Sequence, residues 1–248
     1  MNVLTIFIFV LIIILIYVIY KLMTNPTTTV SDFSDSSKLV VVDTSKTESN
    51  STGNSNYGYS LWLYIDAWGT DGKANINKNI LTRTTTSNIP LFQLYLDNAQ
   101  NNLKLIMSDS TGAPINDKSP CMIRNVQLQK WINITMSVYG NTVDLYLDGK
   151  LVRTCVIPAM PALLSSGDQL NIGGGYNIDT SHKISPTDGD LQGFISNVVY
   201  NADYFSPEEA WNIYSAGYSG AGMFNFLHSY KLNFSITNNN QVVSKFSI

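Results

Sequence analysis

Residues 129–157 read QKWINITMSVYGNTVDLYLDGKLVRTCVI, and this stretch decides the fold. Apolar and polar side chains alternate along it with a period of two, which is typical of a strand with one buried face. One face of its first strand carries Ile132, Ile134, Met136 and Val138, and the other carries Trp131, Asn133, Thr135 and Ser137. Gly140-Asn141 and Asp148-Gly149 interrupt the alternation, and Asp-Gly between apolar runs is a strong hairpin signal. The stretch therefore predicts three consecutive antiparallel strands.

The same alternation recurs along most of the chain after residue 57. The further strands that it predicts are Tyr59–Asp66, Phe92–Leu96, Leu103–Met107, Leu170–Ile172 and Phe194–Tyr200, followed by a last hairpin of Tyr230–Thr237 and Val242–Ile248. Antiparallel strands with one apolar face are buried by packing one sheet on another. The pattern predicts an all-β, two-sheet antiparallel sandwich that the last hairpin closes.

One short helix interrupts the strands. Ser206-Pro207-Glu208-Glu209 has the form of a capping box, in which Ser206 caps the helix, proline takes the first turn and Glu209 reaches back. Apolar residues follow at helical spacing, and Gly217 is a natural end. We therefore expect a helix between Ser206 and Gly217.

The N-terminal run VLTIFIFVLIIILIYVIY, residues 3–20, contains no charged residue, proline or glycine. A helix of about 20 apolar residues spans the hydrocarbon core of a bilayer, so residues 1–23 are predicted to form a single transmembrane helix. The segment lacks the basic start and the small-residue cleavage site of a signal peptide, and it lacks the polar stripe of a core helix. The sequence thus predicts a single-pass membrane protein that contacts lipid through residues 1–23.

The orientation of this anchor stays open. Lys21 directly after the span favours a cytoplasmic sandwich by the positive-inside bias. Glycosylation sequons at Asn50, Asn133 and Asn233 are compatible with the opposite side. Residues 24–56 are rich in Thr, Ser, Asn and Asp and are expected to be a polar linker whose Leu39–Val42 run docks as an edge strand. The folded domain is expected over residues 57–248.

Several segments resemble the LamG-like (laminin G-like) domains of the concanavalin A-like lectin/glucanase superfamily. They are the tryptophan-led strand Gln129–Thr135, the opening strand Tyr59–Tyr64, the DLYLDGKLV hairpin at 144–152, and the strand Gly193–Asn197 with the helix after it. The resemblance covers roughly residues 57–220 and implies a two-sheet jelly roll with a concave face that binds sugars in some relatives. The joining of such a domain to an N-terminal span is similar to membrane proteins of large DNA viruses, which implies a virion membrane as its location.

The composition excludes nucleic acid as a partner, because the net charge is −3 and only 13% of residues are charged. Flat aromatic rings on a strand face can stack on sugar rings. The candidate ligand-binding residues are Trp62, Tyr64, Trp68, Tyr95 and Tyr146. The alternative is that these rings only cover one face of a sheet.

Catalytic chemistry is not expected. The glutamates are Glu48, Glu208 and Glu209, so the E-x-D-x-E strand of the superfamily's glucanases is missing, and a glycosidase needs two opposed carboxylates. His182 and His228 have no recognisable catalytic partner in the sequence.

No cofactor is predicted, although Asp179, Asp188 and Asp190 lie in one loop region and carry oxygen ligands that suit Ca²⁺. Cys121 and Cys155 form either a disulfide or two buried thiols.

These observations lead to three hypotheses of function. The first is a membrane-anchored, non-catalytic module that binds glycans or proteins. The second is a structural virion or coat protein that tethers a membrane to a capsid. The third is a divergent glycoside hydrolase.

Overall fold

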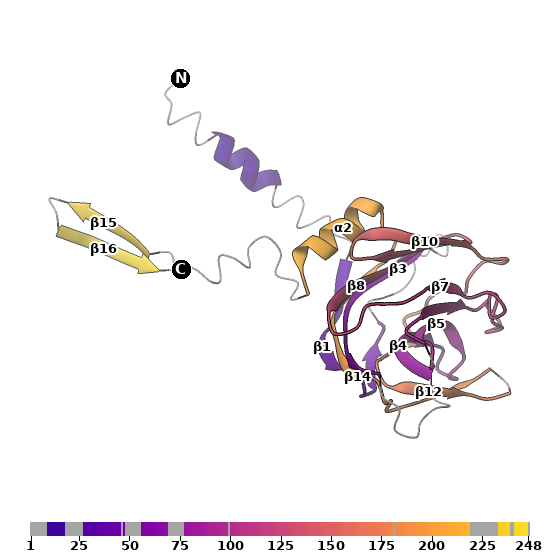
Figure 1. Ribbon diagram of the computed structural model, residues 1–248. Helices are drawn as coiled ribbons and strands as arrows, with labels where there is room; N and C mark the ends of the chain where they lie inside the picture. The colour runs from indigo at the N-terminus through magenta and orange to yellow at the C-terminus, as the bar shows by residue number, and fades with distance from the viewer. Residues whose placement is uncertain are drawn as a thin grey trace.

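The computed structural model describes residues 9–17, 27–45, 47, 56–68, 77–98, 100–180, 182–218, 233–238 and 241–247. Within them the two large antiparallel sheets pack face to face, as the alternation predicted (Figure 1). The six-stranded sheet has the order β1 (Thr27–Asp35), β14 (Gln192–Asn201), β3 (Tyr57–Ala67), β8 (Trp131–Tyr139), β9 (Thr142–Leu147), β10 (Lys150–Val156).

The second sheet has eight strands. Its main path is β13 (Ile184–Thr187), β12 (Gly175–Ile178), β4 (Asn77–Thr84), β5 (Pro90–Leu96), β6 (Leu103–Met107), β7 (Cys121–Ile123), with β11 (Gln169–Ile172) pairing both β4 and β2 (Val40–Asp43). β2 covers most of the Leu39–Val42 run and lies at an edge of this sheet, where its partner is β11.

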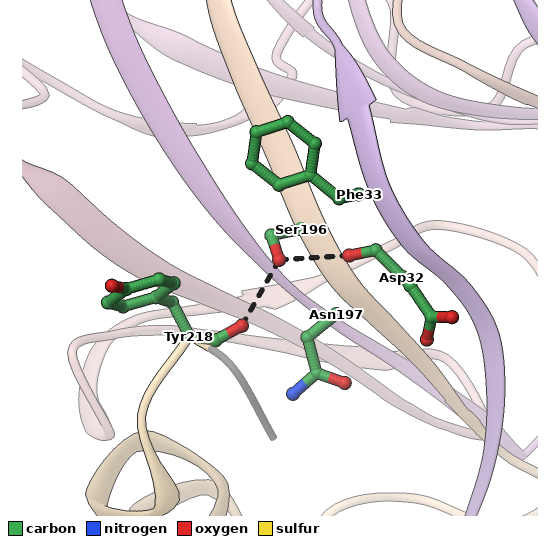
Figure 2. A pocket seen from close by; sticks show the side chains of 5 residues that line it. All are labelled: Asp32, Phe33, Ser196, Asn197 and Tyr218. Atoms are coloured by element: carbon green, nitrogen blue, oxygen red, sulfur yellow. Dashed lines mark hydrogen bonds between the residues drawn. The ribbon is translucent and has the colours of Figure 1, made fainter. Parts of the chain in front are cut away.

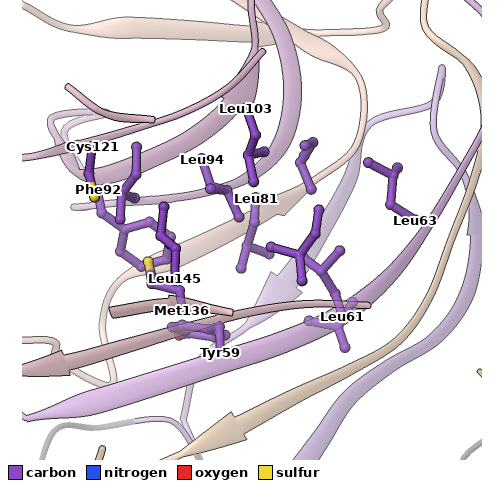
Figure 3. Packing of buried hydrophobic residues seen from close by; sticks show 14 of the residues in the cluster. Tyr59, Leu61, Leu63, Leu81, Phe92, Leu94, Leu103, Cys121, Met136 and Leu145 are labelled. Atoms are coloured by element: carbon purple, nitrogen blue, oxygen red, sulfur yellow. The ribbon is translucent and has the colours of Figure 1, made fainter. Parts of the chain in front are cut away.

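The core lies between the two sheets. The four apolar residues that alternate along β8 are each at most 1% exposed. Figure 3 shows Leu61 and Leu145 of the six-stranded sheet facing Leu94 and Leu103 of the eight-stranded sheet. Full burial of each such side chain contributes about 1.5–3 kcal/mol, so this layer is the main source of stability.

A disulfide ties the two sheets together at one side. Cys121 of β7 is bonded to Cys155 of β10, and each of these strands ends the path of its own sheet. Of the two alternatives left open by the sequence, the structure therefore has the bridge. It links residues 34 positions apart. By lowering the conformational entropy of the unfolded chain, such a bridge stabilises the folded state by about 3–4 kcal/mol.

A buried arginine anchors the loops at the sandwich rim. Arg83 of β4 is 0% exposed and donates from Nε to the Asp168 carboxylate over 2.9 Å. Its Nη1 donates to the backbone oxygen of Thr47 (2.6 Å) and to the Tyr59 hydroxyl (2.8 Å). Because a buried charge must be paired and hydrogen-bonded, these contacts fix the segments around residues 47 and 168 against the core.

Two expectations about domain boundaries need revision. Thr27–Asp35, expected within the polar linker, forms β1 and pairs with β14 at the edge of the six-stranded sheet. An edge strand is held by backbone hydrogen bonds and needs no continuous apolar face, so its Thr- and Ser-rich sequence hides it. The last hairpin exists as β15 (Asn233–Asn238) and β16 (Gln241–Ser247), but within the described residues these two strands pair only with each other.

The predicted anchor falls largely outside the described residues. Residues 9–17 are helical, whereas residues 1–8 and 18–26 lie outside the described ranges. Within the part of the chain that the structure describes, no helix has the length and apolar character needed to cross a bilayer.

Tyr57 and Tyr59 provide a matched test of the core. Both lie on β3 and are at most 1% exposed, but the Tyr57 hydroxyl has no hydrogen-bond partner among the described residues. We expect Tyr57→Phe to leave the free energy of unfolding at neutral pH unchanged or slightly higher. Tyr59→Phe should lower it by about 1–3 kcal/mol, because the substitution removes a buried hydrogen bond to the charged Arg83 guanidinium. Urea unfolding followed by circular dichroism measures both, and equal losses would contradict this account.

The same pair predicts sensitivity to alkali. Burial raises the pKa of both phenols above the ordinary value of 10.0. The unfolded state therefore loses these protons first as the pH rises, so their contribution to stability is complete below pH 10 and declines above it. Tyr57→Phe should weaken this alkaline decline in urea titrations. An unchanged pH profile would show that Tyr57 does not carry it.

Candidate functional site

The outer face of the six-stranded sheet is partly covered by helix α2 (Pro207–Ala216). The predicted capping box is confirmed, since the Ser206 backbone N–H donates to the Glu209 carboxylate (2.8 Å) and the Glu209 N–H donates to Ser206 Oγ (3.2 Å). The helix ends at Gly217 as predicted. Figure 1 shows α2 lying across the sheet near β10.

Close approach to a glycine turn positions this helix. Gly149 has φ +72°, and a Cβ on it would lie 3.1 Å from the Trp211 Cα and 3.0 Å from the Tyr214 Cβ. Before the helix, the Phe205 N–H donates to the Ser137 hydroxyl over 2.9 Å. The β9–β10 turn and the outer face of β8 therefore both hold the α2 segment against the sheet.

Two of the five predicted ligand-binding rings are buried on this face of the sheet. Trp62 of β3 is 5% exposed and stacks on Tyr214 at 5.7 Å between ring centroids. Tyr146 of β9, on the same face, is 1% exposed. Trp62 and Tyr146 are therefore not accessible for stacking on a sugar, and for these two rings the structure favours the alternative that they cover one face of the sheet.

Two more of the predicted rings lie elsewhere. Half-buried Trp68 donates its indole N–H to the Asn98 backbone oxygen over 3.1 Å, and the Lys78 ammonium lies 5.7 Å from the Trp68 ring. Tyr95 lies on β5 of the other sheet and contacts Tyr176 edge-on at 6.3 Å. Its pKa is raised by burial and by the Asp97 carboxylate. The structure therefore does not bring the five predicted residues into one site.

Tyr64 belongs to a different group of rings, here named the aromatic cluster. It consists of Phe33 (β1), Phe194 (β14), Tyr64 (β3), Trp131 (β8) and Tyr218 after α2. The four strands are consecutive neighbours in the sheet, so the rings form a band across it.

Each of the four rings on strands contacts the ring on the neighbouring strand, so the contacts run in order across the sheet. Phe33 stacks on Phe194 at 5.1 Å, and Tyr64 lies 6.5 Å from Phe194 and 5.6 Å from Trp131. Trp131 and Tyr218 are parallel within 2° at 5.0 Å. Phe33, Phe194 and Tyr218 remain 60%, 40% and 49% exposed. The result is a large apolar surface that the described residues do not cover.

A cleft of about 290 Å³ adjoins the cluster and is lined by Asp32, Phe33, Ser196, Asn197 and Tyr218. β14 changes register between Ser196 and Val199, which leaves Asn197 in a bulge with φ +48°. The Ser196 hydroxyl lies 2.9 Å from the Asp32 carbonyl and 3.1 Å from the Tyr218 carbonyl, so it joins β1 to the segment after α2.

The cleft combines two kinds of chemistry. Figure 2 shows the Asp32 carboxylate and the Asn197 carboxamide on one side of the Ser196 hydroxyl, with the rings of Phe33 and Tyr218 on the other sides. No lysine or arginine lines it among the described residues. The arrangement can hold a molecule that has an apolar face for the rings and hydroxyl groups for the carboxylate and amide.

Comparison with known families agrees with this architecture. Residues 41–210, more than half of the chain, match the laminin G-like family model of the concanavalin A-like lectin/glucanases superfamily. The chain belongs to this superfamily. Among proteins with curated descriptions, none matches the sequence significantly.

Solved structures show the same lectin-like fold at low sequence identity. One is the botulinum neurotoxin serotype D ligand binding domain in complex with N-acetylneuraminic acid, which is 14% identical over 77% of this chain with a TM-score of 0.52. Another is the receptor binding domain of botulinum neurotoxin mosaic serotype C/D, also 14% identical over 77% with a TM-score of 0.52. This chain spans 43% and 46% of their lengths, so they establish the fold of the sandwich.

Sequence reasoning missed four members of the aromatic cluster. Phe33 lay in the supposed linker, yet it is the sole aromatic residue of positions 24–56. Trp131 and Phe194 were recognised as parts of superfamily motifs and not as surface rings. Their alternation with the core residues of β8 and β14 is the signal that could have identified them. Tyr218 follows the helix and had no such signal.

The candidate calcium ligands are not brought together. Asp188 pairs with Lys38 at 3.1 Å and Asp190 with Lys78 at 2.8 Å. Asp179 accepts the Lys183 N–H over 2.9 Å within its own turn. Within the described ranges, no group of three or more His, Cys, Asp or Glu side chains is placed to hold a metal ion.

The docking of α2 can be tested with two glycines. Gly149→Ala should lower the free energy of unfolding by more than about 1–2 kcal/mol, because it adds a collision with α2 to the cost of a left-handed backbone. Gly140→Ala is the control, since Gly140 also has positive φ (+56°) but has open space around it. Urea unfolding and quenching of tryptophan fluorescence by acrylamide measure stability and the exposure of Trp62. If Gly149→Ala and Gly140→Ala lose equal stability, and Gly149→Ala does not increase the quenching of tryptophan fluorescence, the contact between the Gly149 turn and α2 is refuted.

Proposed function

We propose that the chain is a membrane-anchored, non-catalytic module that binds glycans at the cleft beside the aromatic cluster. The observation that supports this most strongly is the combination of exposed rings with the Asp32 carboxylate and the Asn197 amide around one cleft. Rings can stack on the apolar face of a pyranose, while a carboxylate and an amide can bind its hydroxyl groups. The lectin-like fold supports the same class of ligand.

The absence of catalysis is part of this proposal. Two aspartates that the sequence places on one hairpin have structural contacts. Asp144 accepts the Thr154 hydroxyl over 2.6 Å, and Asp148 accepts the Asn133 N–H over 2.9 Å in the tight turn before Gly149. Glu209 serves in the helix cap. These contacts favour binding over hydrolysis, because a glycosidase needs two carboxyl groups that face each other across the bond.

Two further observations support the proposed location. The uncharged run at residues 3–20 supports membrane anchoring. The Cys121–Cys155 bridge supports placement of the sandwich on an oxidising side of the membrane, where disulfides persist. We give this bridge more weight than the single Lys21, and on that side of the membrane the cleft would meet extracellular glycans.

Glycan-array screening of the purified chain in detergent micelles tests the proposal, followed by titration of the best oligosaccharide. Phe33→Ala should weaken binding by about tenfold, as loss of a central ring costs more than about 1 kcal/mol. Tyr139→Ala is the matched control, because Tyr139 is 61% exposed against 60% for Phe33 but does not line the cleft. Equal effects of the two substitutions, or no glycan bound by the unaltered chain, would overturn the proposal.

A further inference from the structure

The aromatic cluster is larger than a single sugar ring requires. Phe33 and Tyr218 line the cleft, but the exposed ring of Phe194 lies outside it and stacks on Phe33. Phe194 has no polar atom with which to bind hydroxyl groups, and it remains 40% exposed. A ligand that covers the whole cluster therefore presents an apolar surface to Phe194 as well as polar groups to the cleft.

The chain that leads into β1 is short. Six residues, 21–26, separate Tyr20 at the end of the apolar run from Thr27 at the start of β1. Even fully extended, such a connection reaches at most about 25 Å. With the apolar run in a bilayer, β1 therefore begins within about 25 Å of the membrane surface, and β1 is the strand that supplies Asp32 and Phe33 to the site.

Exposed aromatic rings are favoured at the boundary between lipid headgroups and acyl chains. Two exposed members of the cluster, Phe33 on β1 and Phe194 on β14, lie at the β1 edge of the six-stranded sheet, opposite the β10 edge near which α2 packs. This edge is thus both the one connected to the anchor and the one with uncovered rings.

The charge at the cleft selects among membrane ligands. Asp32 contributes a carboxylate, and no described lining residue contributes a positive charge. A phosphate or a sialic acid carboxylate would be repelled there, whereas the hydroxyl groups of an uncharged sugar would be accepted.

We propose that the site binds the headgroup of a neutral glycolipid in the same membrane that holds the N-terminal anchor. This inference rests on the proposed function and adds the ligand's class and source. The sugar occupies the cleft between Asp32, Asn197 and the rings of Phe33 and Tyr218. Phe194 and the outer part of Phe33 contact the lipid next to the headgroup.

Photo-cross-linking in proteoliposomes tests this inference. The full chain is reconstituted in phosphatidylcholine with either diazirine-labelled lactosylceramide or diazirine-labelled phosphatidylcholine, and cross-links are mapped by mass spectrometry. We expect cross-links at Phe33, Phe194 and Tyr218 to be several-fold stronger with the glycolipid. Asp32→Ala should reduce the glycolipid cross-links to the level of the phosphatidylcholine probe. Circular dichroism of each variant confirms that it is folded.

Soluble lactose titrated into glycolipid-free proteoliposomes separates this inference from the proposed function. Phe194→Ala should weaken glycolipid capture by a larger factor than it weakens lactose binding, because Phe194 lies outside the cleft. Oligosaccharide binding without enhanced glycolipid cross-linking would overturn the inference and leave the proposed function standing. Equal cross-linking of both lipids, unaffected by Asp32→Ala, would overturn the inference by showing a surface that recognises the bilayer alone. The absence of both sugar binding and cross-linking would overturn both.

Discussion

The six-stranded sheet has two faces that other parts of the chain must cover, and this constraint governs the rest of the structure. Its inner face is apolar and is buried by the eight-stranded sheet, which creates the core. Its outer face bears aromatic and polar residues that are buried near α2, such as Trp62, and aromatic residues that stay exposed near β1, such as Phe33. The helix is short, at ten residues, so it protects one part of this face and leaves the other accessible. The proposed binding surface is the part of this outer face that the described residues leave exposed.

The covered part shows what burial demands of polar residues. Beneath the α2 segment, the Ser60 and Thr135 hydroxyls lie 2.8 Å apart, and the Asn133 amide donates to the Leu61 backbone oxygen over 3.1 Å. Buried polar groups are stabilised only when they are hydrogen-bonded, and these residues satisfy one another across neighbouring strands. Asn133 is 0% exposed, so its sequon is not accessible for glycosylation in the folded chain. The polar row under the helix is therefore part of the fold and not a second site.

The sequence predicted the sandwich well, because strand alternation is a local property. The β8–β9–β10 meander, the Asp148-Gly149 turn and the capping box of α2 are each determined by residues that are close together in the sequence.

The candidate site depends on contacts between residues that are far apart in the sequence. Trp62 was misjudged because Tyr214, some 150 positions later, covers it. Phe33 was missed because an edge strand rich in Ser and Thr has no apolar period, and its partner strand lies more than 150 residues further along the chain.

The claim that α2 divides the outer face into a sealed part and an open part is tested most directly by hydroxyl-radical footprinting of the full chain with residue-level mass spectrometry. Two pairs of like residues provide internal standards: Trp62 (5% exposed) with Trp211 (48%), and Tyr146 (1%) with Tyr218 (49%). The account predicts that the first member of each pair is oxidised much more slowly than the second. Oxidation of Trp62 as fast as Trp211 would show that the helix does not seal the sheet, and would contradict the account.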